Sequence, residues 1–250
     1  MHRSSFDKMR AFRDAYLGEH RHAPLSILDV GSTAVAAATE SYRPLFEAPP
    51  WQYRGLDIAP GPNVDIVPCD PYRWAEIPDA SVDVVVSGQA FEHIEWPWLT
   101  IREIARVLRG NGLAAIVAPS AGPVHRFPVD CWRYYPDGMP ALASFAGLGV
   151  VENHWSEGYA YPDCAFWGEA FAVLQRPAAG AASPADCAGN AAPAAASVLA
   201  ATPSRDATAR REAELLAQLR PFALRRQLLA ETLRRAWFIL RSPVGRLHRF

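Results

Sequence analysis

Acidic residues and a glycine close several short apolar runs in this sequence, at positions where a ligand could bind. Asp29 and Gly31 close the first run. Asp57 and Ile58 close the second, and Gln89 follows the fourth. Glycine lets the backbone turn close to a ligand, because it tolerates positive φ angles. A carboxylate at a strand end can accept hydrogen bonds from both hydroxyls of a ribose. The order of these residues favours a nucleoside-containing ligand.

Two further positions belong to the same series. Ser32 follows Gly31, where backbone amides could face a polar group of the ligand. Asp70 and Pro71 follow the third apolar run, where Asp70 could meet an adenine amino group. An Asp after a strand is more often a helix cap or a solvated charge than a ligand. The prediction of a ligand site therefore depends on the series of strand ends and not on any single residue.

A second group of chemically capable residues lies between His125 and Gly138. His125 is the first candidate for a general base that deprotonates a hydroxyl acceptor. Arginines in this run could bind a carboxylate or phosphate, and its aromatic rings could stack on a sugar. The residues expected to contact substrate are Arg126, Asp130, Trp132, Arg133 and Tyr134. The alternative is structural: Asp130 and Arg133 pair to hold the loop, and Trp132 packs in the core.

The elements that must position these residues alternate between strand and helix. Apolar β-branched runs predict strands at residues 25–30, 52–58, 64–67, 81–87, 113–118, 150–154 and 166–174. Helical spacing predicts helices at 5–17, 98–108 and 136–146, the second of them closed by Asn111 and Gly112. This order predicts an α/β fold, a doubly wound, mostly parallel seven-stranded sheet whose last two strands form a hairpin. Ligands bind outside the carboxyl ends of such strands.

The sequence predicts three regions: a domain over residues 1–176, a linker over 177–205 and a helical tail over 206–250. Thirteen of the 29 linker residues are alanine and four are proline, so this segment can bury little apolar surface. The tail has ten arginines and four acidic residues, and it predicts two amphipathic helices. Such a basic helical appendage could lie on an anionic membrane surface or dock on the domain or a partner protein.

Composition excludes several classes of protein. The net charge of −1 does not favour a nucleic-acid binder, and no nucleic-acid partner is expected. The four cysteines are scattered without CxxC spacing, which argues against a zinc site or a disulfide framework. The N-terminus lacks the apolar segment of a secretory signal, and no uncharged apolar run reaches the ~18 residues of a spanning helix. A cytoplasmic location is expected, with peripheral contact at the inner face of the membrane if the tail binds lipid.

The series of strand ends resembles the type 11 group of class I methyltransferases that use S-adenosylmethionine (SAM). The matching segments are ILDVGS, YRGLDIAPG, CDPYRWAEIPDASVDVVVSGQAFEHI and REIARVLRGNGLAAIVAPS, within about residues 25–175. The resemblance implies a Rossmann-like methyltransferase fold and an in-line methyl transfer from the sulfonium. It also implies a SAM site at Asp29, Gly31, Asp57, Asp70 and Gln89. Runs similar to the one after His125 occur in methyltransferases of glycan and surface-polysaccharide clusters.

The sequence departs from the family pattern at two places. No glycine follows Gly31 in its loop, although the family usually has a second and often a third. The Asn/Asp-Pro-Pro-Tyr motif of base and glutamine methylation is also missing, which argues against those substrates. The favoured function is methyl transfer to oxygen of a small-molecule or glycan-type acceptor. One alternative is a weakly active or inactive scaffold that acts through its basic tail. Another is a nicotinamide oxidoreductase, but that class normally needs GxGxxG after the first strand, and this sequence lacks it.

Glu92 and His93 follow the fourth strand, at the start of the helix expected next. Some related quinone-pathway O-methyltransferases place acidic residues and a histidine here for Mg²⁺, but Gln89 stands where the first acid would be. Magnesium prefers several oxygen ligands, so the sequence predicts no metal site. Glu92 is expected to favour the start of the next helix, and His93 to pack beneath the cofactor. His93 is accordingly the weaker candidate for a catalytic residue.

Overall fold

The computed structural model of the chain describes residues 3–34, 41–156 and 167–178. The predicted linker and tail lie outside these residues, apart from Pro177 and Ala178.

A six-stranded sheet forms the centre of the described domain, with the strand order β2-β1-β3-β4-β6-β5. Its strands are β1 (Ser26–Val30), β2 (Gln52–Leu56), β3 (Val82–Gly88), β4 (Leu108–Ala121), β5 (Gly149–Trp155) and β6 (Gly168–Gln175). Strands β1 to β4 pair in parallel, and β6 runs antiparallel to both β4 and β5. The α/β class, the mostly parallel sheet and the final hairpin are therefore confirmed.

Of the seven predicted strands, the one at residues 64–67 is not formed. Only one parallel bridge, between Leu56 and Ile66, stands in its place. The carboxylate of Asp65 accepts a hydrogen bond from the Gly55 amide at 2.7 Å. In a continued sheet, a carbonyl of the neighbouring strand would accept this bond instead. Pro68 then follows without an amide hydrogen to continue a ladder. A side chain thus replaces the strand at this edge of the sheet.

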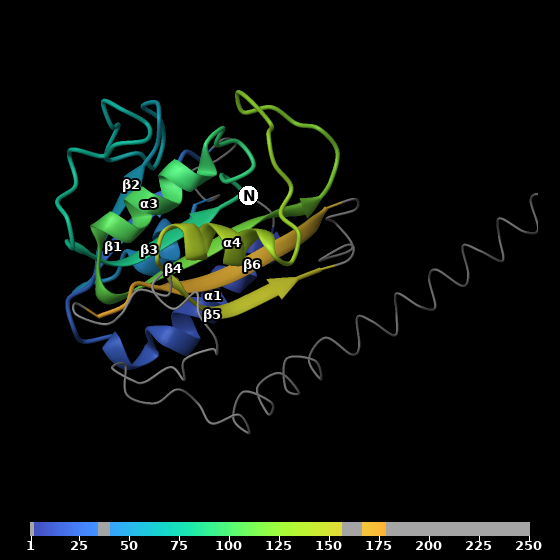
Figure 1. Ribbon diagram of the computed structural model, residues 1–250. Coiled ribbons are helices and arrows are strands. Elements are labelled where there is room, and N and C mark those ends of the chain that lie inside the picture. Colours follow the sequence, from blue (N-terminus) through green and yellow to red (C-terminus); the bar gives the residue numbers. More distant parts are fainter. Residues whose placement is uncertain (1–2, 35–40, 157–166, 179–250) are drawn as a thin grey trace, which may run out of the picture. The chain divides into compact units, whose positions relative to one another are not determined.

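Helices cover both faces of the sheet, with α3 (Pro97–Val107) and α4 (Gly138–Phe145) on the face toward the viewer in Figure 1. The opposite face is covered by α1 (Arg3–Tyr16), the short 3-10 helix η1 (Gly18–His20) and α2 (Arg43–Phe46), of which the sequence predicted only α1. The prediction that Asn111 and Gly112 close the helix at 98–108 is wrong. The helix ends at Val107, and both residues lie within β4, where Asn111 adopts a φ of 68°.

The sheet separates two layers of core. Leu28 and Val85 pack with Ile101 and other side chains of the α3 layer. Their neighbours in the strands, such as Ile27, pack on the other face against α1, with Met9 among the buried residues there. Successive side chains of a strand point to opposite faces, so a sheet buried on both sides needs continuous apolar runs. This requirement explains why the central strands, such as β3, were recognisable in the sequence.

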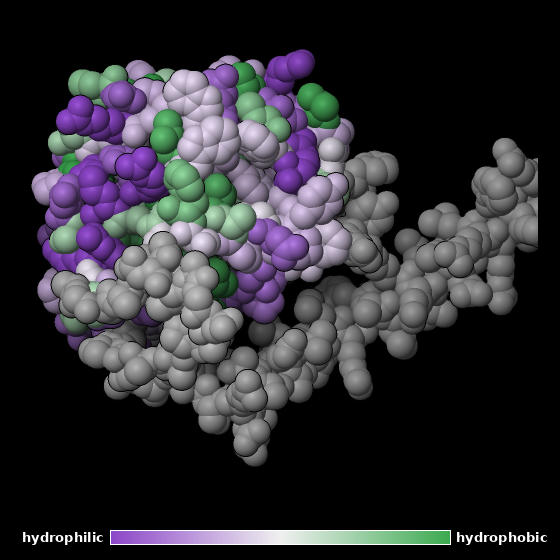
Figure 2. Space-filling view, in the orientation of Figure 1, coloured by the Kyte–Doolittle hydropathy of each residue, from purple (hydrophilic) through white to green (hydrophobic). Residues whose placement is uncertain are grey.

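None of the helices among the described residues is long and apolar enough to cross a membrane. The face that carries α3 and α4 is a mosaic of hydrophilic and hydrophobic residues in Figure 2.

Candidate functional site

The turn that follows β1 requires a glycine. Gly31 has a φ of 77°, a conformation that side chains disfavour. A Cβ atom at this position would lie 2.3 Å from the Cβ of Ala90, in the segment after β3. The end of β1 is therefore packed against the end of β3 with no room for a side chain.

Replacing Gly31 by alanine should lower the free energy of unfolding by roughly 2 kcal/mol or more, from backbone strain and the contact with Ala90. Urea unfolding measures the effect. Gly18→Ala is the matched control, because a Cβ there meets nothing within 4 Å. Equal stability of the two variants would contradict this account of the turn.

The loop after Gly31 uses its amides inside the protein. Gly31 N and Ser32 N both donate to Leu56 O, at 2.9 and 3.2 Å. Thr33 N donates to Asp57 Oδ2 at 2.9 Å, and Ala34 N to Pro62 O at 3.2 Å. The expectation that these amides face a ligand is therefore not met. The buried Ser32 side chain also bonds internally, donating to Asn63 O at 3.1 Å.

Asp29 is a buried acid at the end of β1. Its side chain accepts a hydrogen bond from the Tyr53 hydroxyl, and only 3% of the residue is exposed. Burial disfavours the carboxylate and raises the pKa of Asp29 to about 7, although the bond from Tyr53 acts in the opposite direction. Asp29 is thus held near the carboxyl end of β1, in a setting that resists its ionisation.

Asp57 and Ile58 form the most open part of the predicted cofactor site. Asp57 is half-buried, and its two oxygens accept bonds from Thr33 N and Ile58 N. A carboxylate has about four acceptor positions, so roughly two remain for ribose hydroxyls. The Ile58 side chain beside it is 61% exposed and offers an apolar surface to a flat ring. These residues fit the nucleoside part of SAM.

Asp70 and Pro71 lie in an exposed turn. Asp70 Oδ1 accepts a bond from Tyr72 N at 2.8 Å, and Pro71 O accepts one from the Trp74 indole at 3.0 Å. One oxygen of Asp70 thus stabilises its own turn, as the structural alternative for an acid after a strand expects.

Gln89 follows β3 with a φ of 57°, an uncommon conformation that concentrates at functional sites. Its side chain donates to Glu169 Oε1 at 3.0 Å. Glu169, 1% exposed, also accepts bonds from Ser4 and from Lys8 in α1. Ser4, Lys8 and Glu169 were not predicted to lie at this edge. An acid inside the apolar run of β6 was the one available signal.

Lys8→Met should lower the free energy of unfolding by about 3 kcal/mol, because it leaves the Glu169 carboxylate buried without its cation. Thermal or urea unfolding would show the change. Arg10→Met is the control, since Arg10 pairs with Asp7 on the exposed side of the same helix and should matter by less than about 1 kcal/mol. If Lys8→Met were as mild as Arg10→Met, the other contacts of Glu169, including those with Ser4 and Gln89, would suffice to stabilise it.

Tyr42 covers the end of β3 and was also missed. A Cβ atom at Gly88 would lie 1.8 Å from the Tyr42 hydroxyl, so the ring is packed directly over that glycine. The hydroxyl shares a 2.6 Å hydrogen bond with Ser5 of α1. Helix α1 therefore supports the carboxyl edge at two points. Ser5 shares a hydrogen bond with Tyr42, and Ser4 and Lys8 bond to Glu169.

The loop between β4 and α4 folds back on the segment after β3, and Figure 1 shows it extending beyond the carboxyl end of β4. The amides of Cys131 and Trp132 donate to Glu92 O at 2.7 and 3.2 Å. These bonds bring distant residues together: the rings of His93 and His125 lie 4.7 Å apart, edge to face. The loop thus places its histidine at the same edge as the residues of β1 and β3.

Asp130 and Arg133 hold this loop in shape. Both oxygens of Asp130 accept bonds from the Arg133 guanidinium, at 2.6 and 2.8 Å, and this pairing holds the pKa of Asp130 well below its usual range. Asp130 also accepts a bond from the His125 amide at 2.7 Å. The structural alternative for this pair is therefore supported.

The remaining residues of the predicted substrate loop differ in exposure. Arg126 is exposed, and the Trp132 ring, 38% exposed, donates to Ile94 O at 2.9 Å. Tyr134 is only 6% exposed and donates to Phe91 O at 3.0 Å. A ring so buried cannot stack on a ligand, so Tyr134 has a structural role in this conformation. Arg126 and Trp132 keep surfaces that an acceptor could contact.

Glu92 does not start a helix, contrary to expectation. Residues Phe91 to His93 form a turn, and α3 begins at Pro97. The Glu92 side chain is fully buried, and burial raises its pKa to about 8. Its Oε1 lies 3.7 Å from His93 Nε2 and 4.0 Å from His125 Nε2. Glu92 and the two histidines form a cluster, which we call the Glu92 cluster.

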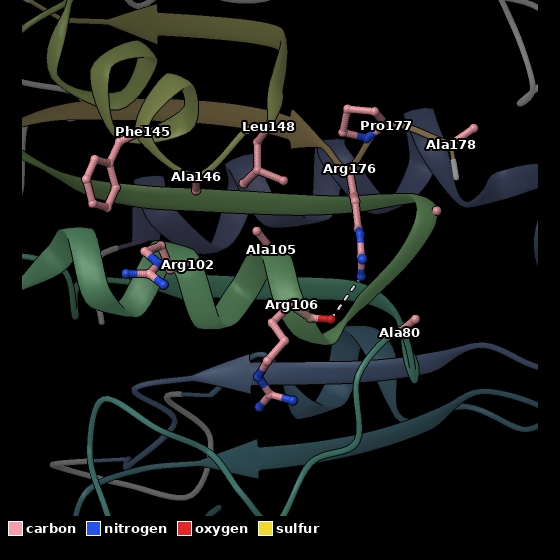
Figure 3. Close-up of a pocket in the computed structure, with 12 residues that line it drawn as sticks. Ala80, Arg102, Ala105, Arg106, Phe145, Ala146, Leu148, Arg176, Pro177 and Ala178 are labelled. Carbon is pink, nitrogen blue, oxygen red and sulfur yellow. Dashed lines mark hydrogen bonds between the residues drawn. The ribbon is translucent and has the colours of Figure 1, made fainter. Parts of the chain in front are cut away.

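A shallow pocket of about 490 Å³ lies at the opposite, amino end of the parallel strands (Figure 3). Arg102, Arg106 and Arg176 line it, and Arg176 donates to Arg106 O at 2.9 Å. The pocket contains none of the residues predicted to bind the cofactor or the substrate. It is therefore separate from the candidate site at the carboxyl ends.

Residues 28–116 match the family model described as a methyltransferase domain. The strand order of the sheet agrees with this match. Residues 28–116 therefore carry a methyltransferase domain. The chain is 52% identical over 44 residues to a Mycobacterium tuberculosis protein named as a probable SAM-dependent methyltransferase. The match covers 18% of the chain and only 16% of that relative's length.

Solved structures share the fold of the methyltransferase domain. The 1,6-didemethyltoxoflavin-N1-methyltransferase of Burkholderia thailandensis, solved with 1,6-didemethyltoxoflavin and S-adenosylhomocysteine, gives a TM-score of 0.52 at 14% identity. The alignment covers 69% of this chain and 78% of that one. The [4+2]-cyclase SpnF gives 0.51 at 14% identity, over 70% and 81% of the two chains. At such identities the likeness shows the fold alone.

Proposed function

We propose that this chain is a SAM-dependent methyltransferase that methylates a hydroxyl oxygen of a small-molecule or glycan-type acceptor. The observation that carries the proposal is the pair Asp57 and Ile58, which leaves free carboxylate acceptors and an exposed apolar side chain at the carboxyl edge. The family match over residues 28–116 supports SAM as the ligand of this edge.

In this proposal each residue of the edge has a distinct task. Asp57 accepts the ribose hydroxyls, and Ile58 contacts the adenine ring. Asp29, when ionised, attracts the positive charges of the methionine part, while Gly31 keeps the backbone of the turn close. Bound SAM supplies a methyl group on a sulfonium sulfur, which an oxygen nucleophile displaces in line.

The choice of oxygen rests on the loop between β4 and α4. A hydroxyl must lose its proton when it is methylated, and His125 is placed to receive it. Its Nδ1 lies 3.5 Å from Asp130 Oδ2, so the fixed carboxylate can stabilise the ring once it has taken up the proton. Arg126 and Trp132 extend the same surface with a guanidinium and a partly exposed indole. Such groups suit a sugar that carries a carboxylate or phosphate.

The fold by itself does not establish methyl transfer, because related folds host other chemistry. The cyclase among the structural neighbours illustrates this point. The test therefore has two parts. Calorimetry of the full chain should show SAM binding. Incubation with labelled SAM and fractionated glycans, lipids and metabolites should then transfer label to one fraction. A folded protein that binds no SAM would overturn the proposal, and binding without transfer to any fraction would favour the scaffold alternative.

A further inference from the structure

Three potential metal ligands meet at the carboxyl edge in the Glu92 cluster. Glu92 and His93 come from the turn after β3, and His125 comes from the loop after β4. One ligand atom from each residue can be chosen so that all three lie within 4.8 Å of one another. The side chains converge although His125 is more than thirty residues away in the sequence.

Glu92 is the residue that calls for an explanation. Its side chain is fully buried, and among the described residues neither Oε1 nor Oε2 has a hydrogen-bond partner. A buried carboxylate without partners is costly, whereas one that binds a metal ion is compensated. The neighbouring imidazoles approach Oε1 to 3.7 and 4.0 Å, which is too far for hydrogen bonds.

The two histidines are oriented as metal ligands usually are. His93 Nδ1 lies 2.6 Å from Val129 O, and a carbonyl can only accept, so Nδ1 carries the proton. In the neutral ring this leaves the lone pair of Nε2 directed toward Glu92. On the other ring, Nδ1 faces Asp130, itself fixed by Arg133. Carbonyl and carboxylate groups behind ligating histidines fix their orientation in metal sites.

We propose that Glu92, His93 and His125 bind one divalent transition-metal ion, with the two Nε2 atoms and one carboxylate oxygen as ligands. Two imidazoles and one carboxylate suit Zn²⁺, Co²⁺ or Fe²⁺, whereas Mg²⁺ prefers oxygen ligands. Metal–ligand distances of about 2.0–2.1 Å place tetrahedral ligands roughly 3.3 Å apart. The ligand atoms must therefore approach by small side-chain rotations. This site revises the expectation that the chain has no metal site.

Metal binding would change the part that His125 plays in methyl transfer. The ion would occupy Nε2, so His125 would hold the metal and could not also serve as the base through that nitrogen. An acceptor hydroxyl that joined the ion would lose its proton to water more readily, because the metal stabilises the anionic oxygen. This consequence rests on the proposed function, whereas metal binding itself does not.

The test uses the full chain after removal of metal with a chelator. Zn²⁺ is titrated by calorimetry, and Co²⁺ is titrated while its visible absorption is recorded. We expect one ion per chain and Co²⁺ bands typical of low coordination. Glu92→Gln, His93→Gln and His125→Gln should each weaken binding at least about 100-fold, and Asp130→Asn, behind His125, about 10- to 100-fold. Circular dichroism confirms that each variant is folded.

His154→Gln is the matched control, because His154 is an exposed histidine of β5 that lies beside a glutamate, Glu152. It should leave metal binding unchanged. Failure of the folded wild-type protein to take up either ion would overturn the proposal. So would binding that survives His125→Gln but is lost in His154→Gln. SAM calorimetry on the same samples keeps the outcomes separate, since SAM binding without metal binding overturns the metal site alone.

Discussion

Asp57→Asn should weaken SAM binding about 100-fold, the equivalent of about 2.7 kcal/mol. The substitution removes the negative charge and one of the two acceptor oxygens. A hydrogen bond to a charged group contributes about 1.5–3 kcal/mol, so the loss of one such bond accounts for the expected effect. The new amide hydrogens would also face Thr33 N–H or Ile58 N–H, which now donate to the carboxylate. Calorimetry of the wild type and the variant with SAM measures the difference.

Asp137→Asn is the control for this experiment. Asp137 is an exposed acid before α4, and its side chain makes no capping hydrogen bond. Its replacement changes the net charge equally and should leave SAM affinity unchanged. Urea unfolding of Asp57→Asn should show a folded protein. If a folded Asp57→Asn variant bound SAM as tightly as the wild type, the nucleoside part would not lie on β2, and the proposed cofactor site would have to move.

The fold was largely predictable because its main determinants are local. Short β-branched runs such as residues 81–87 must be strands buried on both faces, and their alternation with helices determines a mostly parallel sheet. The prediction of an edge strand at 64–67 was wrong for a reason that hydrophobic periodicity cannot show. The Asp65 side chain accepts the hydrogen bond of the Gly55 amide. The apolar residues beside Asp65 have the same sequence pattern whether or not a strand ladder forms. Likewise, α2 has only four residues and leaves almost no periodic signal.

The site was predictable where it depends on strand ends and unpredictable where it depends on tertiary contacts. Gly31, Asp57 and Gln89 lie at the carboxyl edge because their strands are parallel neighbours. The contact of Glu169 with Lys8 joins residues 161 positions apart, and nothing in either segment indicates it. The Glu92 cluster was missed for the same reason. Glu92 and His93 were judged as a pair, whereas the third ligand comes from a loop whose fold depends on bonds to Glu92 O.

Asp29→Asn should stabilise the protein at neutral and higher pH by up to roughly 4 kcal/mol, because it removes the cost of ionising a buried acid. The pKa of Asp29 is 3.8 in the unfolded chain and about 7 in the folded protein. Below the lower value both states hold the proton, and the carboxyl imposes no penalty. As the pH rises toward 7, the unfolded chain releases its proton while the folded protein keeps it, so unfolding becomes easier. Above pH 7 the penalty is complete and constant.

Urea unfolding of the wild type and Asp29→Asn at several pH values between about 4 and 8 measures this difference. The stabilities should converge at the acidic end and diverge toward pH 7. Parallel curves would mean that Asp29 ionises normally in the folded protein.

SAM binding by the same variant tests why the acid is kept. SAM carries a sulfonium and an ammonium group, and an anionic Asp29 would attract both, so the Asp29→Asn variant should bind SAM more weakly while folding more stably. A binding site that gains affinity from a group that destabilises the fold is an expected trade-off. If Asp29→Asn gained stability and kept full SAM affinity, the buried acid would serve neither folding nor cofactor binding, and the assignment of Asp29 to the SAM site would be wrong.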